Sequence, residues 1–395
     1  MTTTYWEYIQ LDQLLSIQSG LEGPGDVALA DELHFIGIHQ SIEIIFKLLL
    51  RELRAARGLL GANYVPEHAM PEVVKHLGRA NEALRVTIAH FRYMELLTPL
   101  DFMEFRAKLG TSSGAQSFQM RELEHLMGLG QDQRHELLRR LRARLARPED
   151  ADPFTPFVLD PLGAIQSQIN AHITRKEAQG LDASVDKWSR QHIQKAMDDI
   201  ETQGTLRSAL EKWLFRTPIC DSTPPPPNTP IDDQAFAEDQ RVVRHFVEDY
   251  IQRGKSVGWN DGHVQAVRQF LGAGQQDSKL DWHTERVRAA LLFIETYLDL
   301  PLLALPRMVL EKVVELEKLA SLFRGAHARM AERVIGNRPG TGGSPGLIYL
   351  DLTRDLRVFP ELIQIRGILI PRDRRWAFPG MEEFGFKLGQ DDGCD

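Results

Sequence analysis

The stretch "ALADELHFIGIHQSIEIIFKLLLRELRAARGLL", residues 28–60, carries the strongest structural signal in the chain. Apolar side chains recur in it at positions 35, 38, 42, 45, 46, 49 and 50. Steps of three and four residues place these side chains on one face of an α-helix, the face that packs against a core. His39 falls on the same stripe, so the sequence predicts a long core helix with an imidazole on its buried face.

Helical periodicity extends over most of the remaining chain. It recurs over residues 71–98, 117–147, 161–215, 236–272 and 307–335. The closest approach to a strand is "GLIYLDL" at 346–352, whose alternation is too short to predict one. The sequence therefore predicts an all-α protein.

Two proline-rich stretches interrupt the helices. "RPEDADPFTPF" (147–157) holds three prolines and "RTPICDSTPPPPNTPIDD" (216–233) holds six. The first breaks the helical pattern, and the second cannot be a helix, because proline lacks a backbone N–H. We expect a helical core domain made of 1–147 and 291–395, with 148–290 as a mostly helical insertion.

Composition narrows the class of protein. The chain has 395 residues, a hydrophobic content of 43% and a net charge of −8. An acidic balance argues against a general nucleic-acid binder, which carries a basic excess. Two cysteines are too few for a disulfide framework or a thiolate metal site. With no signal peptide and no uninterrupted apolar span, we expect a cytoplasmic protein that binds neither nucleic acid nor membrane.

Two histidines lie on the apolar faces of predicted helices, His39 and His327. Such a histidine is commonly a core residue with one hydrogen bond. A pair also suits a haem site, with one imidazole as axial ligand and the other exchanging a proton with the substrate. A non-haem metal site is the alternative. Glu43, one turn after His39, could be its third ligand or only a hydrogen-bond partner.

Arg106 and the glycine-rich stretch "RVIGNRPGTGGSPG" (333–346) are two further candidates. Arg106, beside two phenylalanines, can either extend to solvent or clamp a carboxylate bidentately. The glycine stretch is not a P-loop, because no Lys-Ser or Lys-Thr follows it. It can close over a small polar ligand through Thr341 and Ser344, or merely cap the preceding helix with Gly336.

Five segments, in order along the chain, resemble the tryptophan 2,3-dioxygenase family. They are "YWEYIQLDQLLSIQ" (5–18), "DELHFIGIHQSIEIIFKLLLRELRAA" (31–56), "TPLDFMEFRAKLGTSSGAQS" (98–117), "HARMAERVIGNRPGTGGSPG" (327–346) and "FPELIQIRGILIPR" (359–372). The segment 148–290 is covered only weakly. The resemblance implies the helical fold of that family, haem b as cofactor and O2 as co-substrate.

The resemblance also implies a role for each matching position. His327 would be the axial ligand of the haem iron, and His39 the catalytic histidine that faces the indole nitrogen. The residues implied to bind the substrate are Phe35, Arg106, Thr341 and, from a neighbouring subunit, Tyr5, Tyr8 and Ile9. Ser113 and Gly114 would lie near the haem edge.

The implied reaction is cleavage of the indole C2–C3 bond of L-tryptophan by O2, giving N-formylkynurenine in tryptophan catabolism by the kynurenine pathway. The implied assembly is a homotetramer, a dimer of dimers. A carboxylate brought into an apolar pocket needs a charged donor, which Arg106 would supply.

Four positions depart from the family's pattern. Ile42, Ile45, Ala115 and Pro345 stand where the family usually has serine, tryptophan, phenylalanine and serine. They leave the carboxylate clamp intact but bear on whether the pocket is strictly specific for tryptophan. One alternative is therefore a relative that acts on a substituted tryptophan or inserts a single oxygen atom, giving an oxindole or hydroxylated product. Another is a helical scaffold that has kept the fold without the chemistry.

Overall fold

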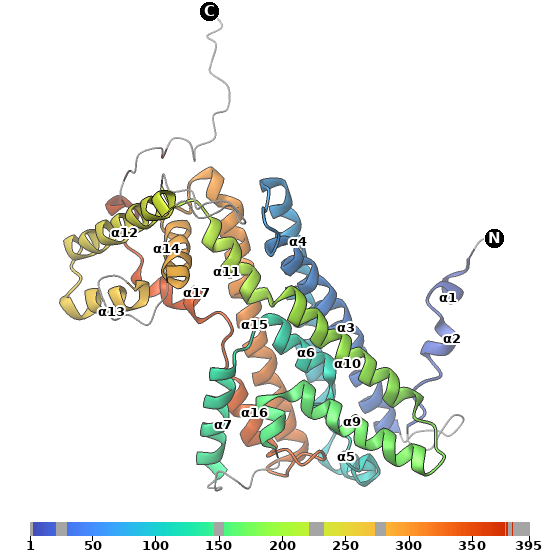
Figure 1. The fold of residues 1–395 in the computed structure, drawn as a ribbon. Helices are drawn as coiled ribbons and strands as arrows, with labels where there is room; N and C mark the ends of the chain where they lie inside the picture. Colours follow the sequence, from blue (N-terminus) through green and yellow to red (C-terminus); the bar gives the residue numbers. More distant parts are fainter. Residues whose placement is uncertain are drawn as a thin grey trace, which may run out of the picture. The chain divides into compact units, whose positions relative to one another are not determined.

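The structure, a computed structural model, describes residues 3–20, 30–145, 154–220, 233–272 and 282–375, together with residues 377 and 381. Every regular element within these ranges is a helix, so the all-α prediction is confirmed (Figure 1). The weak alternation at 346–352 falls in a helix. Most of the proline-rich stretch 216–233 lies outside the described residues.

The α-helices follow the chain in this order: α1 (Tyr5–Tyr8), α2 (Leu11–Leu14), α3 (Ala30–Leu60), α4 (Met70–Met94), α5 (Pro99–Arg106), α6 (Phe118–Met127), α7 (Gln131–Leu145), α8 (Thr155–Leu159), α9 (Pro161–Ala178), α10 (Ser184–Gln203), α11 (Leu206–Arg216), α12 (Asp233–Ser256), α13 (Asp261–Leu271), α14 (Trp282–Thr296), α15 (Ala304–Ile335), α16 (Leu347–Thr353) and α17 (Pro360–Gln364). Short 3₁₀ turns accompany them, including η3 (Gly114–Gln116).

Two compact units divide the described chain. The first takes in described residues of 1–52, 79–202 and 317–358. The second takes in those of 53–78, 203–316 and 359–395. Helices α3, α4 and α15 each contribute residues to both units. The division expected from the sequence, with 148–290 as an insertion, stays a prediction.

The boundaries of the helices around the first unit's core follow from local chemistry. Thr98 caps α5, since its hydroxyl accepts from the backbone N–H of Asp101 while the Asp101 carboxylate accepts from Thr98. Gly128 adopts a left-handed conformation with φ of 104° and ends α6. The single periodic stretch predicted at 117–147 is therefore two helices, α6 and α7.

The apolar stripe of α3 is mostly buried, as predicted, with Phe35 and Ile45 half-buried. Ile38, Phe46 and Leu49 are at most 3% exposed. Phe46 packs against Phe323 of α15, with ring centroids 5.9 Å apart. By length and composition α3 is also the one helix of the described chain that could cross a membrane. Core helices of water-soluble proteins share that length and composition, so this is weak evidence for a membrane span.

The second unit is held together by buried polar contacts as well as apolar ones. Helices α12, α13 and α14 lie against one another, and α11 lies against α14 (Figure 1). Arg286 of α14 is fully buried and donates to Asp239 of α12 at 3.2 Å. The Tyr250 hydroxyl donates to the carbonyl of Ile368 and accepts from the N–H of Ile370. These bonds fasten the segment after α17 to α12.

Candidate functional site

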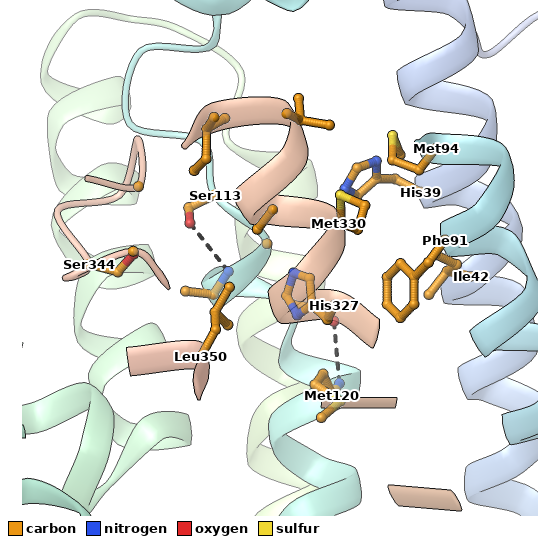
Figure 2. A pocket seen from close by; sticks show the side chains of 18 of the residues that line it. His39, Ile42, Phe91, Met94, Ser113, Met120, His327, Met330, Ser344 and Leu350 are labelled. Atoms are coloured by element: carbon orange, nitrogen blue, oxygen red, sulfur yellow. Dashed lines mark hydrogen bonds between the residues drawn. The ribbon is translucent and has the colours of Figure 1, made fainter. Parts of the chain in front are cut away.

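A cavity of about 250 Å³ lies within the first unit. Its walls come from α3, α4, α5, η3, α6, α15, α16 and residues 336–346, which we call the glycine loop. The predicted residues that line it are Phe35, His39, Arg106, Ser113, Gly114, His327 and Thr341. Residues separated by almost the whole chain thus surround one space, with His39 and His327 on different helices (Figure 2).

His327 lies on α15 among aromatic side chains. Its ring stacks parallel to that of Phe91, with centroids 5.4 Å apart and planes inclined by 3°. Burial, with smaller effects from His39 and the Arg121 cation, lowers the pKa of His327 to about 4. The imidazole is therefore neutral at physiological pH. A neutral ring keeps a nitrogen lone pair for a metal.

His39 lies on α3, one turn after Phe35. Its Nδ1 lies 2.8 Å from the Phe35 carbonyl oxygen, which can only accept. The proton therefore sits on Nδ1, and Nε2 of the neutral ring keeps a lone pair that can accept a hydrogen bond. Burial lowers the pKa of His39, although the Phe35 carbonyl and Glu43 act in the opposite direction. The ring centroids of Phe35 and His39 lie 4.2 Å apart.

Glu43 also lines the cavity, but it is engaged by Gln119 of α6. The Gln119 side-chain amide donates to Glu43 Oε2 at 2.7 Å and to the Glu43 carbonyl at 2.9 Å. Within the described ranges, no group of three His, Cys, Asp or Glu side chains could hold a metal ion. The non-haem alternative therefore lacks a ligand set there, and Glu43 acts as a hydrogen-bond partner.

Arg106, the last residue of α5, lines the cavity instead of extending freely to solvent. One guanidinium nitrogen donates to the Pro339 carbonyl of the glycine loop at 2.8 Å. The Thr341 hydroxyl donates to the Ser112 carbonyl. Both residues expected to bind an amino acid therefore also fasten the loop to the segment 106–113. No carboxylate of the described chain pairs with Arg106.

The glycines of the loop have two separate uses. Gly336, with φ of 59°, follows the last residue of α15, as expected for a helix cap. A Cβ on Gly342 would lie 2.7 Å from Ser113 Cβ, so this glycine permits close approach of the loop to Ser113. The two interpretations left open by the sequence are thus compatible.

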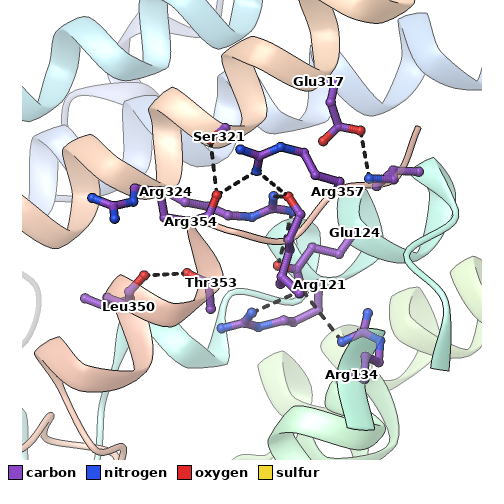
Figure 3. A network of polar contacts seen from close by, with 12 residues as sticks. Arg121, Glu124, Arg134, Glu317, Ser321, Arg324, Leu350, Thr353, Arg354 and Arg357 are labelled. Atoms are coloured by element: carbon purple, nitrogen blue, oxygen red, sulfur yellow. Dashed lines mark hydrogen bonds and ion pairs between the residues drawn. The ribbon is translucent and has the colours of Figure 1, made fainter. Parts of the chain in front are cut away.

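A buried ion network that the sequence did not predict borders the cavity, and three of its four members line it. Its members are Arg121 and Glu124 of α6, Arg134 of α7 and Arg324 of α15, each no more than 8% exposed (Figure 3). Glu124 lies 3.2 Å from Arg121, 4.0 Å from Arg134 and 3.9 Å from Arg324. We call these four residues the charged wall.

Arg121 joins the charged wall to other parts of the site. It contacts the Tyr349 hydroxyl and the Ala115 carbonyl, both at 3.4 Å. Burial alone would raise the pKa of Glu124, but the three guanidinium groups, Arg121 foremost, hold it below its usual range. The signal in the sequence was only Arg121 and Glu124 at i, i+3 of one helix, a spacing that is also common for exposed pairs. Only the fold shows that two further arginines reach the same carboxylate.

The N-terminal residues expected at the substrate pocket do not line this cavity. Tyr5 and Tyr8 of α1 are 70% and 81% exposed, and Ile9 is half-buried. The following segment is fastened to α3, since Gln18 donates to Gln40 at 2.7 Å. Their expected place in a neighbouring subunit's pocket stays a prediction.

Two of the four departures from the family pattern face the cavity. Ile42 and Ala115 line it, whereas Ile45 and Pro345 do not. At a lining position, alanine leaves more room than the phenylalanine that the family usually has there. The loss of a hydroxyl at Ile42 makes the wall beside His39 more apolar.

Comparison with known proteins agrees with this geometry. The sequence model of the family described as tryptophan 2,3-dioxygenase matches residues 1–152 and 256–369. Tryptophan 2,3-dioxygenase 2 of Ralstonia nicotianae is 33% identical over 93% of this chain and 93% of its own. Tryptophan 2,3-dioxygenase of Sorangium cellulosum is 33% identical, covering 97% of this chain and 87% of its own. A tryptophan 2,3-dioxygenase-like protein of Xanthomonas campestris is 32% identical, covering 74% and 98%. The chain belongs to the tryptophan 2,3-dioxygenase family.

Proposed function

We propose that the protein is a haem-dependent dioxygenase that cleaves the indole C2–C3 bond of L-tryptophan with O2 and yields N-formylkynurenine. One observation carries the proposal. Two neutral imidazoles on separate helices, His39 and His327, line the same cavity as an arginine that has no carboxylate partner in the described chain. The names of the relatives favour this reaction over a substituted substrate or insertion of one oxygen atom.

The chemistry of the cavity walls fits a haem. His327 offers one neutral nitrogen ligand, as an axial position requires. Around it stand aromatic and thioether side chains, including Phe91, Met120 and Met330, which suit an apolar macrocycle (Figure 2). When bound, haem b would supply the iron that binds and activates O2. Ser113 and Gly114 would lie near its edge.

The chain's own residues would bind and orient the substrate. Arg106 has guanidinium donors beyond the one bonded to Pro339, and these would pair with the substrate carboxylate. The Thr341 hydroxyl would help to hold the amino-acid group. Phe35 would pack against the indole, whose N–H would donate to His39 Nε2, since that nitrogen carries the free lone pair. These contacts would fix the position of C2 and C3.

The glycine loop would exclude water from the reaction. Its bonds to segment 106–113 come from Arg106 and Thr341, so a bound amino acid would tighten the closed loop through the same two residues. A cytoplasmic homotetramer, arranged as a dimer of dimers, belongs to the same proposal. In it Tyr5, Tyr8 and Ile9 would complete a neighbour's pocket, which accounts for the exposure of the two tyrosines.

Mass analysis of the product tests the proposal. Protein reconstituted with haem and reduced by ascorbate is incubated with L-tryptophan and O2. We expect a product heavier than tryptophan by two oxygen atoms and absorbing as N-formylkynurenine. A product one oxygen atom heavier would instead support the alternative reaction. Protein that shows no Soret band after reconstitution would support a scaffold without chemistry.

A further inference from the structure

The ring of His327 is held differently from the ring of His39. Within the described ranges, neither nitrogen of His327 has a hydrogen-bond partner, whereas Nδ1 of His39 is bonded to the Phe35 carbonyl. A histidine that ligates a metal usually donates its second N–H to a carboxylate or a backbone carbonyl, and that bond fixes the plane of the ring. The torsion that sets this plane is otherwise only weakly constrained. A different contact must therefore orient the His327 imidazole.

The contact that can do so is the stacking of Phe91 of α4 on His327 of α15 (Figure 2). The two ring planes are inclined by only 3°, and the centroids lie 5.4 Å apart. Parallel rings in contact lie about 3.5–4 Å apart along their normal. The two rings are therefore offset, which is an arrangement that aromatic pairs prefer. Stacking covers the face of the imidazole and leaves its edge, where both nitrogens lie, available to a metal.

Phe91 can orient the imidazole because its own position is fixed. Its side chain is 5% exposed, and its ring centroid lies 5.2 Å from that of Phe323, one turn before His327 on α15. Phe323 in turn contacts Phe46 of α3. The Phe323 ring is inclined by 43° to the imidazole at a centroid distance of 6.2 Å, so it does not stack on it. Side chains from α3, α4 and α15 thus hold the stacked pair in place.

We propose that Phe91 is the positioning residue of the axial ligand, because its ring, and not a hydrogen bond to the protein, sets the plane of the His327 imidazole toward the haem iron. The inference rests on the proposed role of His327 as that ligand. A hydrogen bond from the second nitrogen would raise the basicity of the ligand, so an imidazole held by stacking binds the iron as a neutral ring. Loss of the flat face of Phe91 should change the axial bond without changing the ligand.

Resonance Raman spectra of the ferrous, haem-loaded protein test the inference through the iron–histidine stretching band. Phe91→Leu keeps an apolar side chain but removes the flat face, so we expect the band to shift or broaden. The matched control is Phe46→Leu, since Phe46 is 3% exposed and also lines the cavity. Among the described residues its ring contacts Phe323 but not His327, so its band should coincide with that of the wild type. Identical bands in wild type and Phe91→Leu, or equal changes in both variants, would overturn the inference.

A second measurement separates stacking from general damage to the fold. In haem-loaded His327→Gly, added imidazole takes the place of the missing ring, and its affinity is read from the absorption spectrum. Loss of one stacked aromatic pair should weaken this affinity about fivefold when Phe91→Leu is added, whereas Phe46→Leu should leave it within about twofold. Equal affinities in the three proteins would contradict the role of Phe91. An iron–histidine band that His327→Gly retains without imidazole would instead refute the ligand assignment on which the inference rests.

Discussion

The charged wall and the Arg106 clamp both contribute buried or half-buried arginines to the cavity, namely Arg121, Arg324 and Arg106, yet they are built differently. In the charged wall every guanidinium lies within 4.0 Å of Glu124, so the protein supplies the counter-ion itself. Among the described residues, Arg106 is bonded only to a neutral carbonyl of the loop. An arginine that is paired with a carboxylate of the protein has a structural role. An arginine without such a partner is available to bind the carboxylate of a ligand.

This difference predicts two separable kinds of damage. Changes in the charged wall should lower the free energy of unfolding and leave the Michaelis constant of the folded enzyme nearly unchanged. Changes in the clamp should raise the Michaelis constant and leave stability nearly unchanged. A single substitution that both lowered the free energy of unfolding and raised the Michaelis constant would contradict this distinction.

Glu124→Gln should have the largest effect on stability. It leaves three buried guanidinium groups around an uncharged amide, and breaking a buried ion pair costs about 3–5 kcal/mol. Urea denaturation measures the loss. The matched control is Glu136→Gln, which breaks the exposed i, i+3 pair with Arg139 and should leave the unfolding midpoint unchanged. Equal midpoints for Glu124→Gln and wild type would show that the wall is not structural.

His125, next to Glu124 on α6, predicts how stability depends on pH. Burial, followed by the charge of Arg134, lowers the pKa of His125 to about 4. The unfolded chain therefore binds a proton before the folded protein does, and stability should fall as pH drops from about 6.5 to about 4.

The contribution of His125 over this pH interval is on the order of 3 kcal/mol. Urea denaturation of wild-type protein and of His125→Gln at several pH values isolates it. The variant should lose less stability on acidification. A pH dependence identical to that of the wild type would contradict the burial argument.

Arg106→Leu should raise the Michaelis constant for L-tryptophan by about 30-fold or more, because the substrate carboxylate loses a charged partner. Steady-state kinetics provide the measurement, and Arg106→Lys is the control that keeps the charge without the bidentate fork. The unfolding midpoint should stay near that of the wild type. An unchanged Michaelis constant would show that Arg106 does not bind the substrate carboxylate.

Thr341→Ala should have the smallest effect. Loss of one hydroxyl hydrogen bond is worth about 1 kcal/mol, which corresponds to about a fivefold loss in kcat/KM. Thr341→Ser keeps the hydroxyl and should restore most of the activity. If the serine variant were as impaired as the alanine variant, the methyl group and not the hydroxyl would matter.

The two histidines that line the cavity were easier to find from the sequence than the charged wall, and the reason is physical. His39 and His327 stand out because each interrupts an apolar stripe of a long helix, a pattern local to the chain. The charged wall depends on Arg134 and Arg324 reaching Glu124 from other helices, and periodicity holds no information about such contacts. Helix ends were missed for a similar reason, since Gly128 divides a stretch whose apolar period continues through it.

The absorption spectrum of ferrous protein reconstituted with haem tests the central claim, that His327 holds the iron in the cavity it shares with His39. Wild-type protein should show a histidine-ligated ferrous haem that responds to L-tryptophan. His327→Gly should lose that spectrum and regain it when imidazole is added. A His327→Gly protein with unchanged axial ligation in the absence of imidazole would contradict the assignment.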